Sequence, residues 1–104
     1  MAALTEIDLP VDVPLYTLRL TLEGSEFVLR FDYNGKEDRW YLSVYDGDAN
    51  PIRRGVKIVV NQNVLRQCVH AGKPKGLLIF FGEENPTFSA LGRIVKLYYL
   101  PSVP

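Results

Sequence analysis

Three oxygen-bearing side chains, Asp46, Asp48 and Asn50, alternate along the stretch YDGDANPIRRG and could bind a cation. The first ligands of an EF-hand calcium loop have this spacing, but that loop also needs glycine at its sixth position and a bidentate acidic residue at its twelfth. Counted from Asp46, these positions hold Pro51 and Lys57. The stretch therefore predicts a tight turn in which Asp and Asn side chains bond to their own backbone, and no metal site.

A second chemical possibility is a nucleophilic pair of Cys68 and His70, which would share one face of a strand. Nothing obvious in the sequence orients the imidazole, and a cysteine with apolar neighbours is more often a packing residue. A tetrahedral zinc site would need more cysteine and histidine ligands than the one of each that the chain has. We therefore predict no enzymatic activity, no metal and no cofactor; a thiol that is labelled at neutral pH would support the hydrolase alternative.

Arginine and tyrosine side chains are the main candidates for binding a partner. On one face of a small β-barrel they could bind and stack on single-stranded nucleic acid; they are Arg19, Arg30, Arg39, Arg53, Arg54, Tyr41 and Tyr45. Acidic residues lie in the same segments, and the 12 basic residues of the chain balance 12 acidic ones. Because exposed arginine and tyrosine also build protein interfaces, a protein partner is favoured and nucleic acid is the alternative.

These side chains need a scaffold, and alternating hydrophobicity predicts one made of strands. Strands are expected over residues 16–23, 26–33, 39–45, 56–60, 76–81 and 93–100, with a hairpin joining the first two and a turn at Asn34 and Gly35. The stretch GLLIFF is apolar on both faces and predicts a central strand covered on each side. Residues 61–70 predict a short helical turn or an irregular crossover.

The predicted fold is all-β: a small, single-domain antiparallel barrel or sandwich of about seven strands. Residues 15–104 form the domain, whose core includes Phe27, Phe31, Trp40 and Leu42. Residues 1–14, with Pro10 and Pro14, form an extended N-terminal arm. The lone cysteine and the absence of a signal-peptide pattern favour a reducing cytoplasm, and no apolar run suits a spanning helix, so no membrane partner is expected.

Two surfaces are predicted to make contacts. One is the outward face of the 39–45 strand, with Arg39, Tyr41 and Tyr45, and the other is the arm with Pro10 and Pro14. The open alternative for the tyrosines is that they cover a second sheet of the same chain.

The order of features along the chain indicates a resemblance to a known protein family. The segments DRWYLSVYDGDANPIRRGVKI, GKPKGLLIFF and LGRIVKLYYLP together resemble the baseplate plug proteins of simple contractile-tailed phages. The resemblance covers nearly all of residues 14–101, whereas residues 1–13 and 61–75 match nothing that can be placed.

The resemblance implies a structural virion protein of the phage tail baseplate, made in the host cytoplasm. Several copies would surround the tail axis, contact the tail hub and tail-tube proteins, help close the tube and help assemble the baseplate. Such a protein would work through surface complementarity, without bond-making chemistry.

Overall fold

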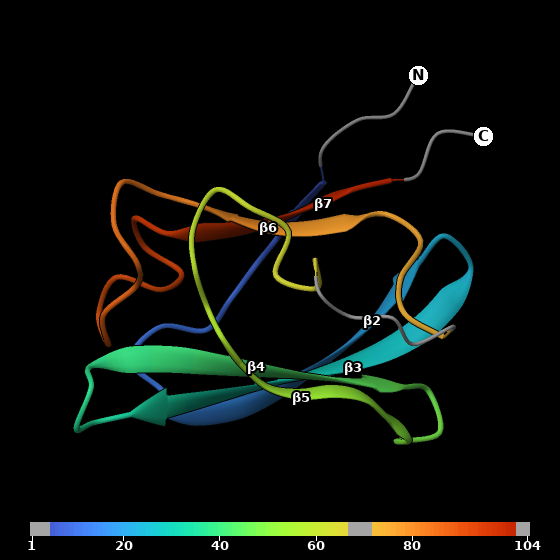
Figure 1. The fold of residues 1–104 in the computed structure, drawn as a ribbon, viewed down its shortest axis with the longest axis horizontal. Helices are drawn as coiled ribbons and strands as arrows, with labels where there is room; N and C mark the ends of the chain where they lie inside the picture. The colour runs from blue at the N-terminus through green and yellow to red at the C-terminus, as the bar shows by residue number, and fades with distance from the viewer. Residues whose placement is uncertain (1–4, 67–71, 102–104) are drawn as a thin grey trace.

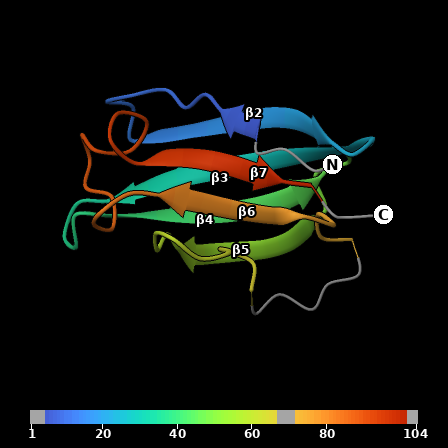
Figure 2. The same ribbon diagram turned by 90° about the horizontal axis from the view of Figure 1, so that it is seen from above.

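The structure, a computed structural model, describes residues 5–66 and 72–101. Its strands are β1 (Thr5–Ile7), β2 (Leu15–Leu22), β3 (Ser25–Asn34), β4 (Arg39–Asp46), β5 (Pro51–Lys57), β6 (Leu77–Phe81) and β7 (Lys96–Leu100). A four-stranded antiparallel sheet has the order β2-β3-β4-β5, and a three-stranded antiparallel sheet has the order β1-β7-β6. The two sheets lie one above the other (Figures 1 and 2). The predicted all-β fold is confirmed, and of the two predicted architectures the protein adopts the sandwich.

The β2–β3 hairpin forms where alternation predicted it. Leu22 pairs with Ser25, so Glu23 and Gly24 are the two loop residues, and their φ angles of 50° and 85° are both positive. Two-residue loops with this backbone match the right-handed twist of the flanking strands. The hairpin prediction is confirmed.

The turn between β3 and β4 forms where it was predicted, and its backbone is shaped by a side chain. The Asn34 side-chain oxygen accepts hydrogen bonds from the amides of Lys36 and Glu37 at 3.0 and 3.3 Å. Positive φ occurs at Asp38 (53°), whereas Gly35 does not adopt it. Asn34 therefore contributes through its side chain, and Gly35 is not the residue that requires the unusual backbone angle.

Strand β5 begins at Pro51, so the predicted strand over residues 56–60 was placed too late in the chain. As an edge strand, β5 accepts a proline at its first position because that residue needs no ladder amide. The β4–β5 register shifts between Leu42 and Tyr45, and the Gly55 amide donates to the Ser43 hydroxyl at 3.0 Å. With φ of 69°, Gly55 adopts the left-handed backbone conformation at this irregularity.

The core lies between the inner faces of the two sheets. The four predicted core residues are buried: Phe27, Phe31, Trp40 and Leu42. Leu78, Phe80, Leu97 and Tyr99 come from the facing sheet. The Phe31 and Phe80 rings meet edge to face with centroids 6.2 Å apart, which joins the sheets at the centre of the molecule.

The segment after β5 is an irregular crossover over residues 58–66, and residues 67–70 of that prediction lie outside the described residues. The Asn61 and Val64 amides donate to the carbonyls of Phe80 and Leu78 at 2.6 and 2.9 Å. These bonds cover the outer edge of β6. The other edge of β6 pairs with β7, so the backbone of β6 is bonded on both sides.

The last strand begins at Lys96, later than the predicted 93–100 strand. Residues 91–95 form a turn in which the Val95 amide bonds to the Ala90 carbonyl at 3.0 Å and Gly92 has φ of 87°. The chain therefore reverses before β7 starts. Within the segment predicted as an arm, Thr5–Ile7 forms β1 and pairs with β7 in register from Thr5 opposite Tyr99 to Ile7 opposite Leu97.

Candidate functional site

The outward face of the four-stranded sheet carries the predicted aromatic residues. Tyr41 lies between Asp32 and Lys57 in the register, and Tyr45 lies between Val28 and Pro51. The three-stranded sheet covers the opposite face, so these tyrosines do not cover a second sheet of the same chain. Both side chains are half-buried and remain accessible.

Hydrogen bonds to neighbouring residues hold Tyr41 and Arg39 in place on this face. The Tyr41 hydroxyl donates to the Glu37 carboxylate, and this hydrogen bond raises the pKa of the tyrosine. The Arg39 guanidinium donates to the Asp38 carbonyl at 2.8 Å. Of the predicted contact residues, Tyr41 and Arg39 are therefore held in place by hydrogen bonds to their neighbours.

Ion pairs reduce the positive charge that nucleic acid would need on this face. Arg19 bonds to Glu26 at 2.6 Å, and Arg30 bonds to Asp32 at 3.2 Å. Two of the arginines in the nucleic-acid hypothesis are thus partly neutralised by neighbours on the same sheet. The arrangement favours a protein surface over a phosphate backbone.

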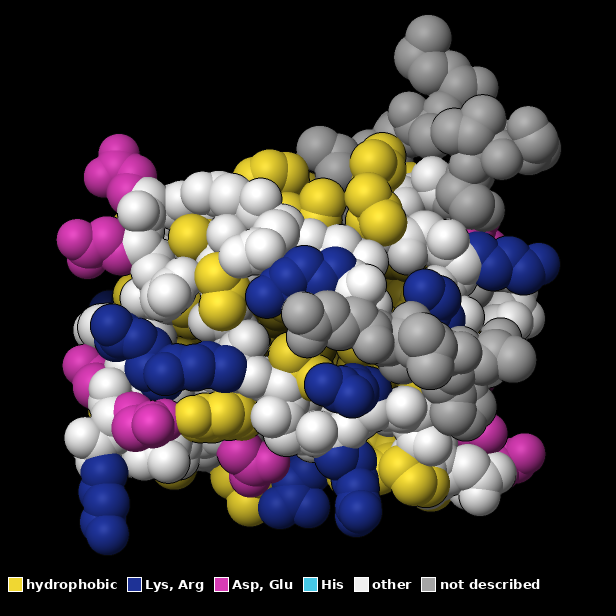
Figure 3. Space-filling view, viewed as in Figure 1, with side chains coloured by type: hydrophobic (Ala, Val, Ile, Leu, Met, Phe, Trp, Pro, Cys, Tyr) yellow, Lys and Arg dark blue, Asp and Glu magenta, His cyan; other side chains and the backbone are white. Residues whose placement is uncertain are grey.

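The outer face of the three-stranded sheet is apolar, which the sequence prediction missed. Its outward side chains are Leu77, Ile79 and Phe81 from β6 and Tyr98 and Leu100 from β7, with Lys96 and Glu6 beside them. We call this set the β6–β7 face. Leu77 and Phe81 are each 38% exposed, and hydrophobic side chains are visible at the upper margin of Figure 3, above these strands. The prediction that GLLIFF is covered on both sides was wrong, because only its inner face is covered by the described part of the chain.

The contacts within the β6–β7 face hold its rings in place. Phe81 and Tyr98 pack edge to face with centroids 5.3 Å apart, and the Tyr98 hydroxyl donates to Glu6 at 3.1 Å. An ordered apolar sheet face surrounded by polar groups is the usual chemistry of a protein interface core.

The predicted proline-containing segment lies against the domain and keeps its prolines exposed. Pro10 and Pro14 are both exposed, and the Pro14 carbonyl accepts a bond from the Tyr33 amide at 2.9 Å. Asp12 pairs with Arg93, which holds the segment to the turn before β7. The segment therefore presents its prolines from a fixed position.

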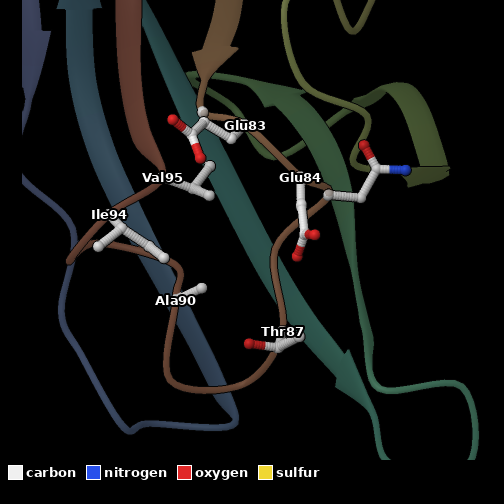
Figure 4. A pocket seen from close by; sticks show the side chains of 8 residues that line it. Glu83, Glu84, Thr87, Ala90, Ile94 and Val95 are labelled. Atoms are coloured by element: carbon white, nitrogen blue, oxygen red, sulfur yellow. The ribbon is translucent and has the colours of Figure 1, made fainter.

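A hollow of about 440 Å³ opens at the loop that follows β6 (Figure 4). Glu83 and Glu84 lie at its rim, and Ala90, Ile94 and Val95 supply apolar lining. The loop is anchored from the core, since the Trp40 indole N–H donates to the Thr87 carbonyl at 2.9 Å and Phe88 stacks on the Trp40 ring.

The Asp46 turn has the chemistry that the sequence predicted. One Asp46 carboxylate oxygen accepts bonds from the amides of Asp48 and Asn50, each at 2.9 Å, and the other accepts from the Asn50 side chain at 3.2 Å. Both oxygens are therefore used within the turn. Residues 5–66 and 72–101 contain no group of three or more His, Cys, Asp or Glu suited to a metal ion, and Cys68 and His70 lie outside these ranges.

Residues 4–102 match the family model described as cyanophage baseplate Pam3 plug gp18. The chain belongs to this baseplate plug family. The resemblance drawn from the sequence is confirmed, and no curated protein matches the chain.

Membership of the plug family implies a structural role in the baseplate and a place in the phage tail, in association with other tail components. Its surfaces agree with such a role, since they offer aromatic and apolar side chains on two opposite sheet faces. Among the described residues, no helix has the length and apolar character to cross a membrane.

Proposed function

We propose that this plug-family chain is a docking subunit at the centre of the baseplate. It contacts the tail hub and tail-tube proteins, helps close the tube before infection and helps assemble the baseplate around the tail axis. Several copies act together, each made in the host cytoplasm and then incorporated into the virion. Docking proceeds by surface complementarity and requires no catalysis.

The observation that carries this proposal is the β6–β7 face. An isolated domain gains nothing from placing Leu77, Phe81 and Leu100 outward on a sheet, because apolar surface is stabilising only when it leaves water. A partner protein that covers the face recovers about 25 cal/mol for each Å² of apolar surface buried. Outward apolar side chains on both β6 and β7 therefore support a protein partner.

The tyrosine face and the proline segment provide further contacts in this proposal. Tyr41 and Tyr45, with Arg39, are residue types that concentrate binding energy in interfaces. Pro10 and Pro14 fix the backbone φ angle at two positions of the segment, which lowers the entropy lost when a partner binds. The two sheet faces point in opposite directions, so one copy can touch two different neighbours at once.

The test is reconstitution with the hub and tube proteins of the same phage. The wild-type chain is expected to form a complex of defined stoichiometry with one or both in native mass spectrometry. Leu77→Ser/Phe81→Ser should weaken the complex by on the order of a hundredfold, because two apolar contacts are lost from the centre of an interface. Leu77→Ile/Phe81→Leu keeps the face apolar and should retain binding.

Three results would contradict the proposal. A folded wild-type chain that ignores both proteins would remove it, and equal binding by the serine and conservative variants would exclude the β6–β7 face. Salt-dependent retention on single-stranded DNA, without docking to either tail protein, would favour the nucleic-acid alternative.

A further inference from the structure

Two hollows of opposite charge lie on different parts of the surface. The first, described above, is the acidic hollow, whose lining includes Glu83, Glu84 and Ile94. Ile94 is 77% exposed, the highest value among the large hydrophobic residues that are exposed in the described chain. This region of the surface therefore offers an exposed apolar side chain together with two carboxylates.

The second hollow, of about 230 Å³, lies where β5 meets the crossover that follows it. Arg53, Lys57 and Arg66 line it, and the remaining lining is Gly55, Val56, Val59 and Val64. No acidic residue is part of the lining. We call it the basic socket, and Figure 3 shows Lys and Arg side chains spread across the side of the molecule on which β5 and the crossover lie.

The charges of both hollows are without ion-pair partners inside the described chain. The ion pairs there join Arg19 to Glu26, Arg30 to Asp32 and Arg93 to Asp12, so neither the socket cations nor Glu83 and Glu84 take part. The chain has no net charge, with 12 basic and 12 acidic residues, so no overall repulsion keeps copies apart. Segregated, complementary charge on a neutral molecule favours association of one copy with another.

We propose that copies of this chain associate head to tail, with Ile94 of one copy inserted into the basic socket of the next. The valines of the socket cover the isoleucine, while Glu83 and Glu84 pair with Arg53, Lys57 and Arg66 around it. The two surfaces differ, so the contact is heterologous and closes into a ring when the rotation between copies permits. The inference rests on the proposed presence of several copies around the tail axis and identifies the surfaces that join them.

Charge reversal tests the contact without disturbing the core, because all four residues to be changed are exposed. Glu83→Lys/Glu84→Lys and Arg53→Glu/Lys57→Glu should each weaken self-association by on the order of a hundredfold or more, since like charges then face one another. An equimolar mixture of the two variants should assemble again, because each reversed surface finds an opposite one. Sedimentation velocity across a concentration series measures all three samples against wild type.

The matched control is Lys36→Glu/Lys75→Glu, which reverses two exposed charges outside both hollows and should assemble like wild type. Ile94→Asp should also abolish assembly, and circular dichroism of each variant establishes that it is folded. A wild-type chain that stays monomeric at every concentration would overturn the inference, as would reversed variants that assemble normally. Wild-type binding to single-stranded DNA that is lost in Arg53→Glu/Lys57→Glu, without self-association, would instead assign the socket to nucleic acid.

The same samples separate this inference from the docking proposal. A wild-type chain that remains monomeric and still binds the hub or tube protein would remove the head-to-tail contact and leave the docking function intact. A chain that self-associates as described and binds neither tail protein would support the head-to-tail contact and contradict the docking function.

Discussion

The Tyr16 hydroxyl gives the most direct test of how the sandwich is stabilised. Its oxygen is buried, and it has no hydrogen-bond partner among the described residues. The ring itself packs well, stacked on Phe31 with centroids 4.8 Å apart and edge-on to Trp40 at 5.9 Å. Tyr16→Phe would keep these ring contacts and remove only the unpaired hydroxyl.

The expected magnitude follows from the cost of an unpaired buried group, roughly 1–3 kcal/mol. We expect Tyr16→Phe to raise the free energy of unfolding by about 1 kcal/mol, which raises the melting temperature by about 4–8 °C for a domain of this size. Tyr99→Phe is the matched opposite case. The Tyr99 hydroxyl accepts a bond from the Gly76 amide at 2.9 Å and donates to Glu23, so its loss should cost about 1–3 kcal/mol.

Urea unfolding of the two variants, followed by the fluorescence of the single tryptophan, Trp40, measures both changes. Trp40 is 1% exposed when folded, so unfolding should alter its emission strongly. A loss of more than about 1 kcal/mol in Tyr16→Phe would show that its hydroxyl is satisfied and would refute the reasoning. A Tyr99→Phe variant whose free energy of unfolding equals that of the wild type would refute it as well.

Three further predictions concern pH, glycine and the Asp46 turn. Burial, and secondly the hydrogen bond to Glu23, raise the pKa of Tyr99 from 10.0 to about 12. The contribution of Tyr99 to stability is therefore complete below about pH 10 and is lost as the pH rises toward 12. Alkaline denaturation should therefore be steeper for wild type than for Tyr99→Phe over that range, and parallel curves would contradict this. Gly76→Ala should destabilise the fold by about 3 kcal/mol, because the new Cβ would lie 2.1 Å from the Leu100 carbonyl oxygen. At Gly55 a new Cβ would meet no atom within 4 Å, so Gly55→Ala should cost only about 1–2 kcal/mol, which comes from the positive φ of that residue. Thermal melts that rank these two variants in the other order would count against the structure. Asp46→Ala should lower the free energy of unfolding by about 1–2 kcal/mol, because the hydrogen bonds that Asp46 accepts within the turn are lost. Added calcium should leave the melting temperature of the wild type unchanged, and a clear rise would restore the metal hypothesis.

The sequence predicts strands β2, β3 and β4 well because their hydrophobic alternation is regular. Phe27, Phe31, Trp40 and Leu42 follow the two-residue period on β3 and β4, and all four are buried. The same regularity places Tyr41 and Tyr45 on the outward face. In these strands the pattern, the turns and the packing all agree.

The edges of the fold are less predictable from sequence. A proline at position 51 argues against a strand in general, yet an edge strand tolerates it as its first residue. The β1–β7 pairing joins residues at the two ends of the chain, and no local pattern reports such a long-range contact. The crossover at residues 58–66 depends on bonds from Asn61 and Val64 to β6, which are equally remote in sequence.

The candidate contact surfaces also differ in whether they can be predicted from the sequence. Arg39, Tyr41 and Tyr45 can be found from alternation, because polar and aromatic residues on the outward side of a strand leave a visible pattern. The β6–β7 face cannot, since GLLIFF is apolar at every position after its glycine and the sequence does not say which side a sheet covers. The uniform apolar run indicates only that both faces of the strand need a cover, and the described residues supply one on the inner face alone.

Cross-linking mass spectrometry on purified phage tails tests the central claim most directly. Lys96 lies outward on β7, opposite Phe81 and beside Tyr98, and therefore reports contacts of the β6–β7 face. The account predicts cross-links from Lys96 to lysines of the tail hub or tail-tube protein. Recovery of this chain from tails with Lys96 linked to neither protein would contradict it.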